Sequence, residues 1–394
     1  MTTASFSGGQ YEGSVHFNET PVFIFSPVPV IVDMPDAPDG YPYTLEVTNA
    51  NSGQSYTETR EIHSGKAHFE ISRILQHLMS REFSEVFSEA RSPRGANQDI
   101  QCKLIDVEAE AAFTFYFLAF FGALDQLESY AYTAGAPSDS PATRRLWVNY
   151  PQTFTMQADY DDHYPVKAPD GTIILLDGSF NDYGVCEVQL RDALLNSGDK
   201  GKALVEQFDS GKTMTLGLSV YYQVSDSGRR LKGSGFQYFR IIPDLTPARH
   251  GTYLRWLQRD GSFGYWLFQN GDQAAAIKED RAFRRTVLGD ATSPSERGEF
   301  AHFRDNPMQA DFTESQTLSL GTYVESAEEF DYLLGLASSP MVERLVYLKD
   351  GAEEGWQRVN IAPGSYARSR KRTTPKRSSF EVSIILPQRN TIKL

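Results

Sequence analysis

The sequence contains only two cysteines, Cys102 and Cys186, among 394 residues. Two thiols so far apart exclude the dense disulfide framework of a small secreted domain and any pair of CxxC metal-binding motifs. The first residues lack a basic stretch followed by an apolar stretch, so the sequence predicts no secretory signal. We therefore expect synthesis in a reducing compartment.

Positive charge and long apolar runs are also scarce. The chain has 38 Lys and Arg against 51 Asp and Glu, a formal net charge of −13. This balance argues against a general nucleic-acid binder, because such proteins need a basic surface to replace the counterions of the phosphates. The most apolar run, FTFYFLAFFGALDQL from Phe113, is too short for a membrane span. We expect a soluble protein without membrane contact.

The motifs of common catalytic and cofactor sites are missing. Gly211-Lys212-Thr213 resembles the end of a phosphate-binding loop, but position 206 is Glu where that motif requires Gly. The acidic stretch DYDDHY at positions 159–164 could ligate a hard cation, but it lacks the Gly and the distal Glu of a calcium loop. A solvated acidic loop is the favoured interpretation. We assign no catalytic, cofactor-binding or metal-binding residue, and we expect a protein that is not an enzyme and has no cofactor.

Aromatic residues, in contrast, are abundant, with 25 Phe and 20 Tyr, and they favour strands. In residues 20–75, short β-branched and aromatic runs alternate with Pro, Gly, Asn and Asp clusters about ten residues apart, as is typical of a sandwich or barrel. The sequence therefore predicts a mainly β fold with short helical insertions (α+β), built from tandem β-sandwich or barrel-like units.

Individual strands can be placed from the same pattern. YTLEVTNA and SYTETREI flank NSGQ and predict a hairpin, and AFTFYFLAFFGA predicts a strand. In FIFSPVPVIV, Pro27 and Pro29 each remove a ladder hydrogen bond, so we expect an edge strand or a bent one. Strands are also expected in TMTLGLSVYYQV, FQYFRIIP, MVERLVYL, QRVNIAPGSY and FEVSIILPQRN.

Four stretches change to the helical period. Apolar residues recur at i, i+3, i+4 and i+7 in EISRILQHLMSREFSEVF, and the expected apolar face consists of Ile71, Ile74, Leu75, Leu78, Met79 and Phe83. QLRDALLNSG and KALVEQFDSG predict two shorter helices. In ESAEEFDYLLGLASSP, Ser326 and Glu329 predict a capping box, and Pro340 ends the helix.

Composition also predicts the domain organisation. TAGAPSDSPATRR, residues 133–145, is rich in Ala, Ser and Pro and is expected to be a linker. We expect a β-rich domain with one helix at 1–132 and a second β-rich domain at 146–272. A C-terminal α+β region at 273–394 should end in a hairpin with a basic tip, and a polar interval at 270–300 separates it from the second domain.

The stretch GTYLRWLQRDGSFGYWLFQNGD, residues 251–272, carries six aromatic rings around an Asp-Gly turn. TYLRWLQ and FGYWLF predict two strands joined by Arg259-Asp260-Gly261-Ser262, with Gly where φ is positive. Both faces of each strand are mostly apolar, so the rings should be covered on both sides. A sugar-binding platform would instead need rings on one exposed face. We expect these rings to pack in the core or against another subunit; they are Tyr253, Trp256, Tyr265, Trp266 and Phe268.

One basic block stands out in the acidic chain. ARSRKRTTPKRSS lies between two predicted strands and carries six cations without an acid: Arg368, Arg370, Lys371, Arg372, Lys376 and Arg377. It is expected to be a projecting hairpin tip. It could be a solvated loop, an assembly contact that docks on an acidic neighbouring subunit, or a contact with nucleic acid in a lumen.

The order of these pieces resembles virion structural proteins of tailed bacteriophages or prophages, of the distal-tail or baseplate ring type. The stretches that carry the resemblance are GKAHFEISRIL, YLRWLQRDGSFGYWLF and the ending LLGLASSPMVERLVYL…WQRVNIAPGSY…SSFEVSIILPQRN. The resemblance implies β-sandwich or barrel units that form a homo-oligomeric ring with other virion proteins, with no catalytic residues. It implies location in the virion after synthesis in the cytoplasm of the bacterial host. The extra predicted helices are not typical of that family, so a ring in the neck of the virion is the alternative location.

Two hypotheses from other classes stay open. A carbohydrate-binding host-recognition module would use surface rings from YAYT and DGYPY. A hydrolase would use two carboxylates that the sequence alone does not identify among its 51 acidic residues.

Overall fold

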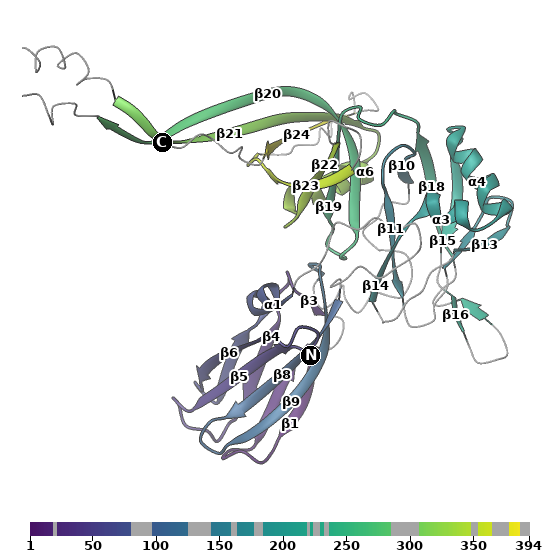
Figure 1. Ribbon diagram of the computed structural model, residues 1–394. Helices are drawn as coiled ribbons and strands as arrows, with labels where there is room; N and C mark the ends of the chain where they lie inside the picture. Colours follow the sequence, from purple (N-terminus) through teal and green to yellow (C-terminus); the bar gives the residue numbers. More distant parts are fainter. Residues whose placement is uncertain are drawn as a thin grey trace, which may run out of the picture. The chain divides into compact units, whose positions relative to one another are not determined.

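The computed structural model describes residues 1–18, 22–79, 97–124, 143–158, 164–176, 184–218, 221–223, 229–231, 236–284, 307–347, 354–364 and 378–386. The chain forms two compact units: one comprises Met1–Ala248, Arg255–Tyr265 and Asp331–Pro340, the other Arg249–Leu254, Trp266–Phe330 and Met341–Leu394. The fold is mainly β with short helices, as predicted (Figure 1). The division at 1–132, 146–272 and 273–394 stays a prediction.

The N-terminal part of the first unit is a β-sandwich (Figure 1). One sheet has the order β1-β2-β4-β7, formed by Thr2–Phe6, Gly13–Phe17, Pro29–Asp33 and Lys66–Glu70. The other has the order β3-β9-β8-β5-β6, formed by Val22–Phe23, Ala111–Phe120, Asn97–Asp106, Pro42–Asn49 and Ser55–Glu61. Aromatic rings join the two sheets, because Phe17 stacks on Phe115 with ring centroids 4.1 Å apart and Phe6 meets Tyr43 edge-on at 6.2 Å.

Several elements of the sandwich follow the sequence pattern. Strands β5 and β6 form the predicted antiparallel hairpin, and β9 is the predicted strand of AFTFYFLAFFGA. Helix α1, Ser72–Leu78, buries Ile74, Leu75 and Leu78 as the helical period predicts. Met79 follows the helix with an extended backbone, and Phe83 lies outside the described residues.

The expectation for FIFSPVPVIV needs a correction. The stretch is broken into β3, at the edge of its sheet, and β4, which pairs with both β2 and β7 and is therefore internal. The two prolines permit this because Pro27 lies between the strands and Pro29 is the first residue of β4, where a missing N–H is tolerated. Of the two strands in this stretch, β3 lies at a sheet edge and β4 does not.

The middle of the first unit contains a five-stranded sheet of order β10-β18-β15-β12-β13. Its strands are Thr143–Trp147, Gln237–Asp244, Met214–Leu218, Tyr164–Lys167 and Ile173–Leu176. Helices α3, Leu190–Asn196, and α4, Asp199–Asp209, are the two predicted short helices, and residues from them share a buried cluster with Leu216, Phe239 and Ile241. Two small antiparallel pairs complete this part: β11 with β14, Thr153–Ala158 and Gly184–Gln189, and β16 with β17, Tyr221–Gln223 and Arg229–Leu231.

The linker prediction at 133–145 is wrong for its last three residues. Thr143, Arg144 and Arg145 belong to β10 and pair in parallel with β18. The ladder supplies backbone partners that composition alone does not reveal, and it draws Arg144 into the interior. The preceding residues of the predicted linker lie outside the described ranges.

Six strands in the order β19-β20-β21-β24-β23-β22 close into a barrel. They are Thr252–Leu257, Phe263–Arg284, Pro307–Val324, Ser378–Leu386, Glu354–Ile361 and Val342–Tyr347. The expected polar interval at 270–300 is wrong up to Arg284, because β20 continues to that residue and pairs with β21. Backbone pairing along a second strand overrides the polar composition there.

Helix α6, Ala327–Ser338, begins with the predicted Ser326 cap, but the reciprocal bond of the predicted capping box is displaced by one residue. The Glu329 N–H donates to Ser326 Oγ at 3.1 Å. The Glu329 carboxylate in turn accepts from the Glu325 N–H at 2.7 Å. The first bond satisfies one of the N–H groups that helical hydrogen bonding leaves unpaired, and the second satisfies the N–H of the residue before Ser326.

Candidate assembly surface

The five aromatic residues singled out in the central hairpin are all buried. At most 4% of any of them is exposed: Tyr253, Trp256, Tyr265, Trp266 and Phe268. Within the second unit, the Trp266 Nε1–H donates to Thr322 Oγ1 at 2.9 Å. Within the first unit, the Trp256 ring centroid lies 5.0 Å from that of Tyr332. These rings contact other residues of their own unit and do not form an exposed platform for a ligand.

The turn of this hairpin is buried too. Gly261 has a φ of +82°, and a Cβ there would lie 2.3 Å from the Phe121 carbonyl oxygen, so only Gly fits. The Ala123 N–H donates to the Arg259 carbonyl oxygen at 2.7 Å. The fully buried Asp260 uses Oδ1 to accept from the backbone N–H and the hydroxyl of Ser262. The turn is therefore held against the end of β9.

The guanidinium of Arg144, a half-buried residue, lies near this turn. Burial lowers the pKa of Arg144 to about 10, an effect opposed by Tyr332 and Asp260. Its guanidinium carbon lies 4.2 Å from the ring centroid of Phe239 and 5.0 Å from that of Phe154. Because this pKa remains far above 7, Arg144 is charged at neutral pH, and its electrostatic attraction to Asp260 favours the packed position of the turn. This cluster is structural.

The tyrosines considered for sugar binding are not surface rings where they are described. Tyr41 is 5% exposed and Tyr43 is fully buried, so DGYPY does not supply the surface rings that the carbohydrate-binding alternative would use. The Tyr41 hydroxyl instead donates to Asp106 Oδ1 at 2.6 Å. Burial and this carboxylate raise the pKa of Tyr41. YAYT, at 130–133, lies outside the described residues.

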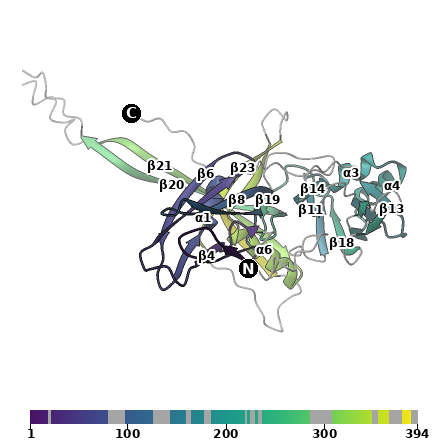
Figure 2. The ribbon, with the colours of Figure 1, turned by 90° about the horizontal axis from the view of Figure 1, so that it is seen from below.

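The second unit carries a long two-stranded extension. Among the described residues, 276–284 of β20 pair only with 307–315 of β21, because β24 joins β21 no earlier than Gln316. We call these two segments the ribbon. At 3.3 Å per residue the ribbon is about 30 Å long. Figure 1 shows it extending past β22, β23 and β24, and Figure 2 shows it extending past β23.

The outer edges of the ribbon are unpaired in the described part of the chain. A two-stranded hairpin on its own is marginally stable in water, and three or more strands or a packed face are needed for independent stability. Unpaired N–H and C=O groups along a strand are also a template for pairing with another chain. The ribbon is therefore the feature of this unit best suited to a protein–protein contact.

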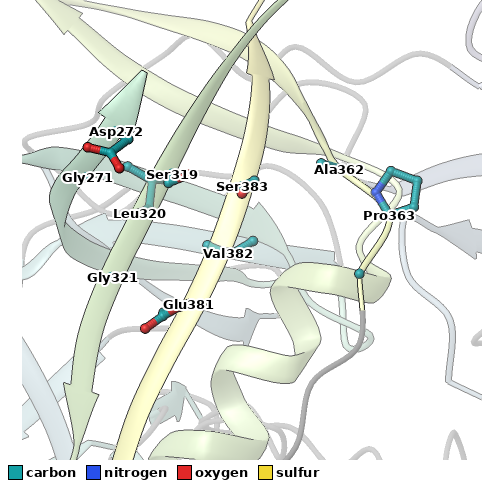
Figure 3. Close-up of a pocket in the computed structure, with 11 residues that line it drawn as sticks. Gly271, Asp272, Ser319, Leu320, Gly321, Ala362, Pro363, Glu381, Val382 and Ser383 are labelled. Carbon is teal, nitrogen blue, oxygen red and sulfur yellow. The ribbon is translucent and has the colours of Figure 1, made fainter. Parts of the chain in front are cut away.

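A groove lies at the base of the ribbon (Figure 3). Gly271 and Asp272 form a bulge opposite the single residue Ser319, between the pairs Asn270–Leu320 and Gln273–Leu318. Such bulges bend a strand away from its neighbours, often at barrel rims. The bend leaves a cavity of about 580 Å³ beside strands β21 and β24. We call this cavity the base groove.

Small and acidic residues line the base groove. Ser319 and Ser383, a backbone pair of β21 and β24, lie between Asp272 on one side and Pro363 on the other (Figure 3). The Ala362 N–H donates to the Ser383 carbonyl oxygen at 2.8 Å, which fixes the rim next to Pro363. Asp272 and Glu381 supply negative charge, and no lining residue is basic.

The predicted assembly contacts Arg368, Arg370, Lys371, Arg372, Lys376 and Arg377 lie outside the described residues. The structure does show that the strands on either side, β23 and β24, are antiparallel neighbours, and that Gly364, just before the basic block, lines the base groove. The acidic stretch 159–163 also lies outside the described residues. Among the residues that are described, no group of three or more His, Cys, Asp or Glu could hold a metal ion.

Sequence reasoning missed both the ribbon and the base groove. For the groove, a usable signal is TLSL at 317–320, where apolar and polar residues alternate as in a half-buried strand and which includes the lining residues Ser319 and Leu320. Within the described ranges, no helix has the length and apolar character needed to cross a membrane.

Comparison with known proteins gives no assignment. No protein-family model matches the chain, and no curated protein matches it. Among solved structures, one described as "Marsupial T cell receptor" aligns with this chain at 10% sequence identity and a TM-score of 0.17. The alignment covers 88% of this chain and 98% of the receptor chain. A superposition this poor carries no conclusion about fold or function.

Proposed function

We propose that the chain is a non-enzymatic structural subunit of a bacteriophage virion that assembles into a ring through protein–protein contacts. The observation that carries the proposal is the ribbon, which offers two unpaired strand edges in the described part of the chain. The ring belongs to the tail, baseplate or neck, in agreement with the family that the sequence resembles. Other virion proteins are its further partners.

Physical chemistry supports assembly over ligand turnover. Extending a sheet across a subunit boundary provides many backbone hydrogen bonds at once, and their directionality fixes the register of the partner. A contact between two different surfaces of identical subunits repeats from copy to copy and closes into a ring when its rotation permits. The ribbon and the surface that receives it would form such a pair.

The test removes the ribbon and retains the barrel. Ala275 and Gln316 are directly paired, so residues 276–315 can be replaced by Asn-Gly, a dipeptide that joins antiparallel strands in a two-residue turn. The wild-type protein should form particles of one defined copy number in mass photometry and rings in negative-stain images. The shortened variant should keep its circular dichroism spectrum and melting temperature but remain a monomer.

Two results would contradict the proposal. A wild-type protein that stays monomeric at every accessible concentration would argue against a self-assembling ring subunit. A shortened variant that forms the same rings as the wild type would show that the ribbon does not carry assembly.

A further inference from the structure

The base groove has a chemical character of its own. Its charged lining residues are Asp272 and Glu381, both exposed, and no cation among the lining residues neutralises them. Two carboxylates beside a cavity of about 580 Å³ favour a cationic occupant.

Gly321 keeps the floor of the groove open. It lies on β21 opposite Glu381 of β24, and a Cβ built on it would meet nothing within 4 Å. A glycine inside a strand is less favourable than residues with a side chain. No neighbouring atom in the described structure explains why the position is Gly, whereas an occupant lying on the strand would.

An exposed aromatic ring stands next to the groove. Tyr323 is 61% exposed and lies two positions along β21 from Gly321, on the same face of the strand. A guanidinium or ammonium group placed over such a ring gains a cation–π attraction. Glu381, which pairs with Gly321, lies on the same face of the sheet as this ring, and a carboxylate beside an aromatic face is a combination suited to arginine.

We propose that the base groove of one subunit binds the basic block, residues 368–377, of a second copy of the chain. This block supplies six cations and no acid. The proposal rests on the proposed function, since it identifies one of the contacts between ring subunits. The occupant comes from a second copy because a cationic block and an anionic groove on one subunit form a complementary pair that can repeat from copy to copy.

The first test fills the floor of the groove. Gly321→Val places a β-branched side chain where the subunit leaves open space, so folding should be unaffected or improved. Gly355→Val is the matched control, because Gly355 also lies on a barrel strand with nothing within 4 Å of a built Cβ and does not line the groove. We expect Gly321→Val to weaken subunit association about tenfold or more, and Gly355→Val to leave it unchanged.

The second test reverses charge. Asp272→Lys with Glu381→Lys should abolish assembly, and so should Arg370→Glu with Arg372→Glu, while both variants remain folded. Mixing the two should restore association, but only between unlike variants, because the intact basic block of the first fits the intact groove of the second and the reversed block of the second fits the reversed groove of the first. Combining all four substitutions in one chain should restore assembly.

The outcomes separate the two proposals. Wild-type rings with unaltered association of Gly321→Val would overturn this inference and leave the proposed function standing. A wild-type protein limited to dimers that Gly321→Val dissociates would support the inference and contradict the ring. A wild-type protein that is monomeric throughout would overturn both. Charge-reversed variants that do not associate with each other on mixing would show that the basic block folds onto its own groove or elsewhere.

Discussion

The indole of Trp256 lies directly against the backbone of Gly264. A Cβ built on Gly264 would be 2.4 Å from Trp256 Cε2, far inside van der Waals contact. Trp256 itself is fully buried. This pair shows why a glycine is found between aromatic residues in FGYWLF, where the ring occupies the volume that a side chain would need.

Gly264→Ala should therefore destabilise the first unit by about 1–3 kcal/mol, as expected for overpacking a filled core. The measurement is urea unfolding followed by circular dichroism. Gly355→Ala is the control and should be close to neutral, because a Cβ there meets nothing within 4 Å. Equal effects of the two substitutions would contradict the packing seen at Gly264.

Trp256→Ala should destabilise the same unit by about 3–5 kcal/mol, the range for an emptied aromatic site in a core. The two substitutions should also couple. Once the ring is gone, Gly264→Ala meets no obstacle, so the double variant should be more stable than the sum of the single effects predicts. A Trp256→Ala protein of unchanged stability would argue that this ring serves a ligand and not the core.

Stability of the N-terminal sandwich should fall at acid pH because of Asp106. Burial opposes its ionisation, but hydrogen bonds from the Tyr41 hydroxyl and from the N–H groups of Gln10, Ala109 and Glu108 outweigh this and lower its pKa. A carboxyl whose pKa is lower in the folded state contributes stability above its unfolded pKa, near 4, and loses that contribution as pH falls through the folded value.

Melting temperatures measured from pH 7 to pH 2 test this linkage. Asp106→Asn should melt lower than wild type at pH 7, and the difference should shrink below about pH 4 as the wild-type carboxyl protonates. Tyr41→Phe removes one of the four donors and should give an intermediate profile. A difference between Asp106→Asn and wild type that stays constant over the whole range would contradict the assignment.

The start of helix α6 depends on Ser326. Ser326→Ala removes the acceptor of the Glu329 N–H and should reduce the local stability of the helix by about 1 kcal/mol. Amide hydrogen exchange in the first turn should therefore quicken about fivefold. Ser338→Ala, at the exposed C-terminal end of the same helix, is the matched control and should change exchange little.

Local periodicity predicted a large part of this fold. The β5–β6 hairpin, strand β9 and helices α1, α3, α4 and α6 all follow patterns confined to a few neighbouring residues. The burial of Tyr253, Trp256, Tyr265, Trp266 and Phe268 agrees with a strand that is apolar on both faces. Where the spacing of apolar side chains and the local composition indicate the same type of element, the sequence predicts that helix or strand correctly.

The elements that the sequence pattern did not predict are held in place by strands distant in the chain. Residues 271–284 read as a polar interval, but their strand is held by backbone pairing with β21, and the side chains of residues 271–275 are exposed. Thr143–Arg145 look like linker until β18 pairs with them. The base groove depends on a bulge and on three strands meeting, and no stretch of a few residues contains that information.

The hydrogen bond from Ala123 to Arg259 has a consequence for synthesis of the chain. The turn at Gly261 occupies the end of β9 so closely that a side chain at Gly261 would strike Phe121. While the ribosome extends the chain, β9 emerges long before the turn at Gly261, which covers the end of this strand. That end of the sandwich therefore exposes Phe120, Phe121 and their neighbours until the central hairpin has been translated, and chaperone binding to the nascent chain should concentrate in that interval.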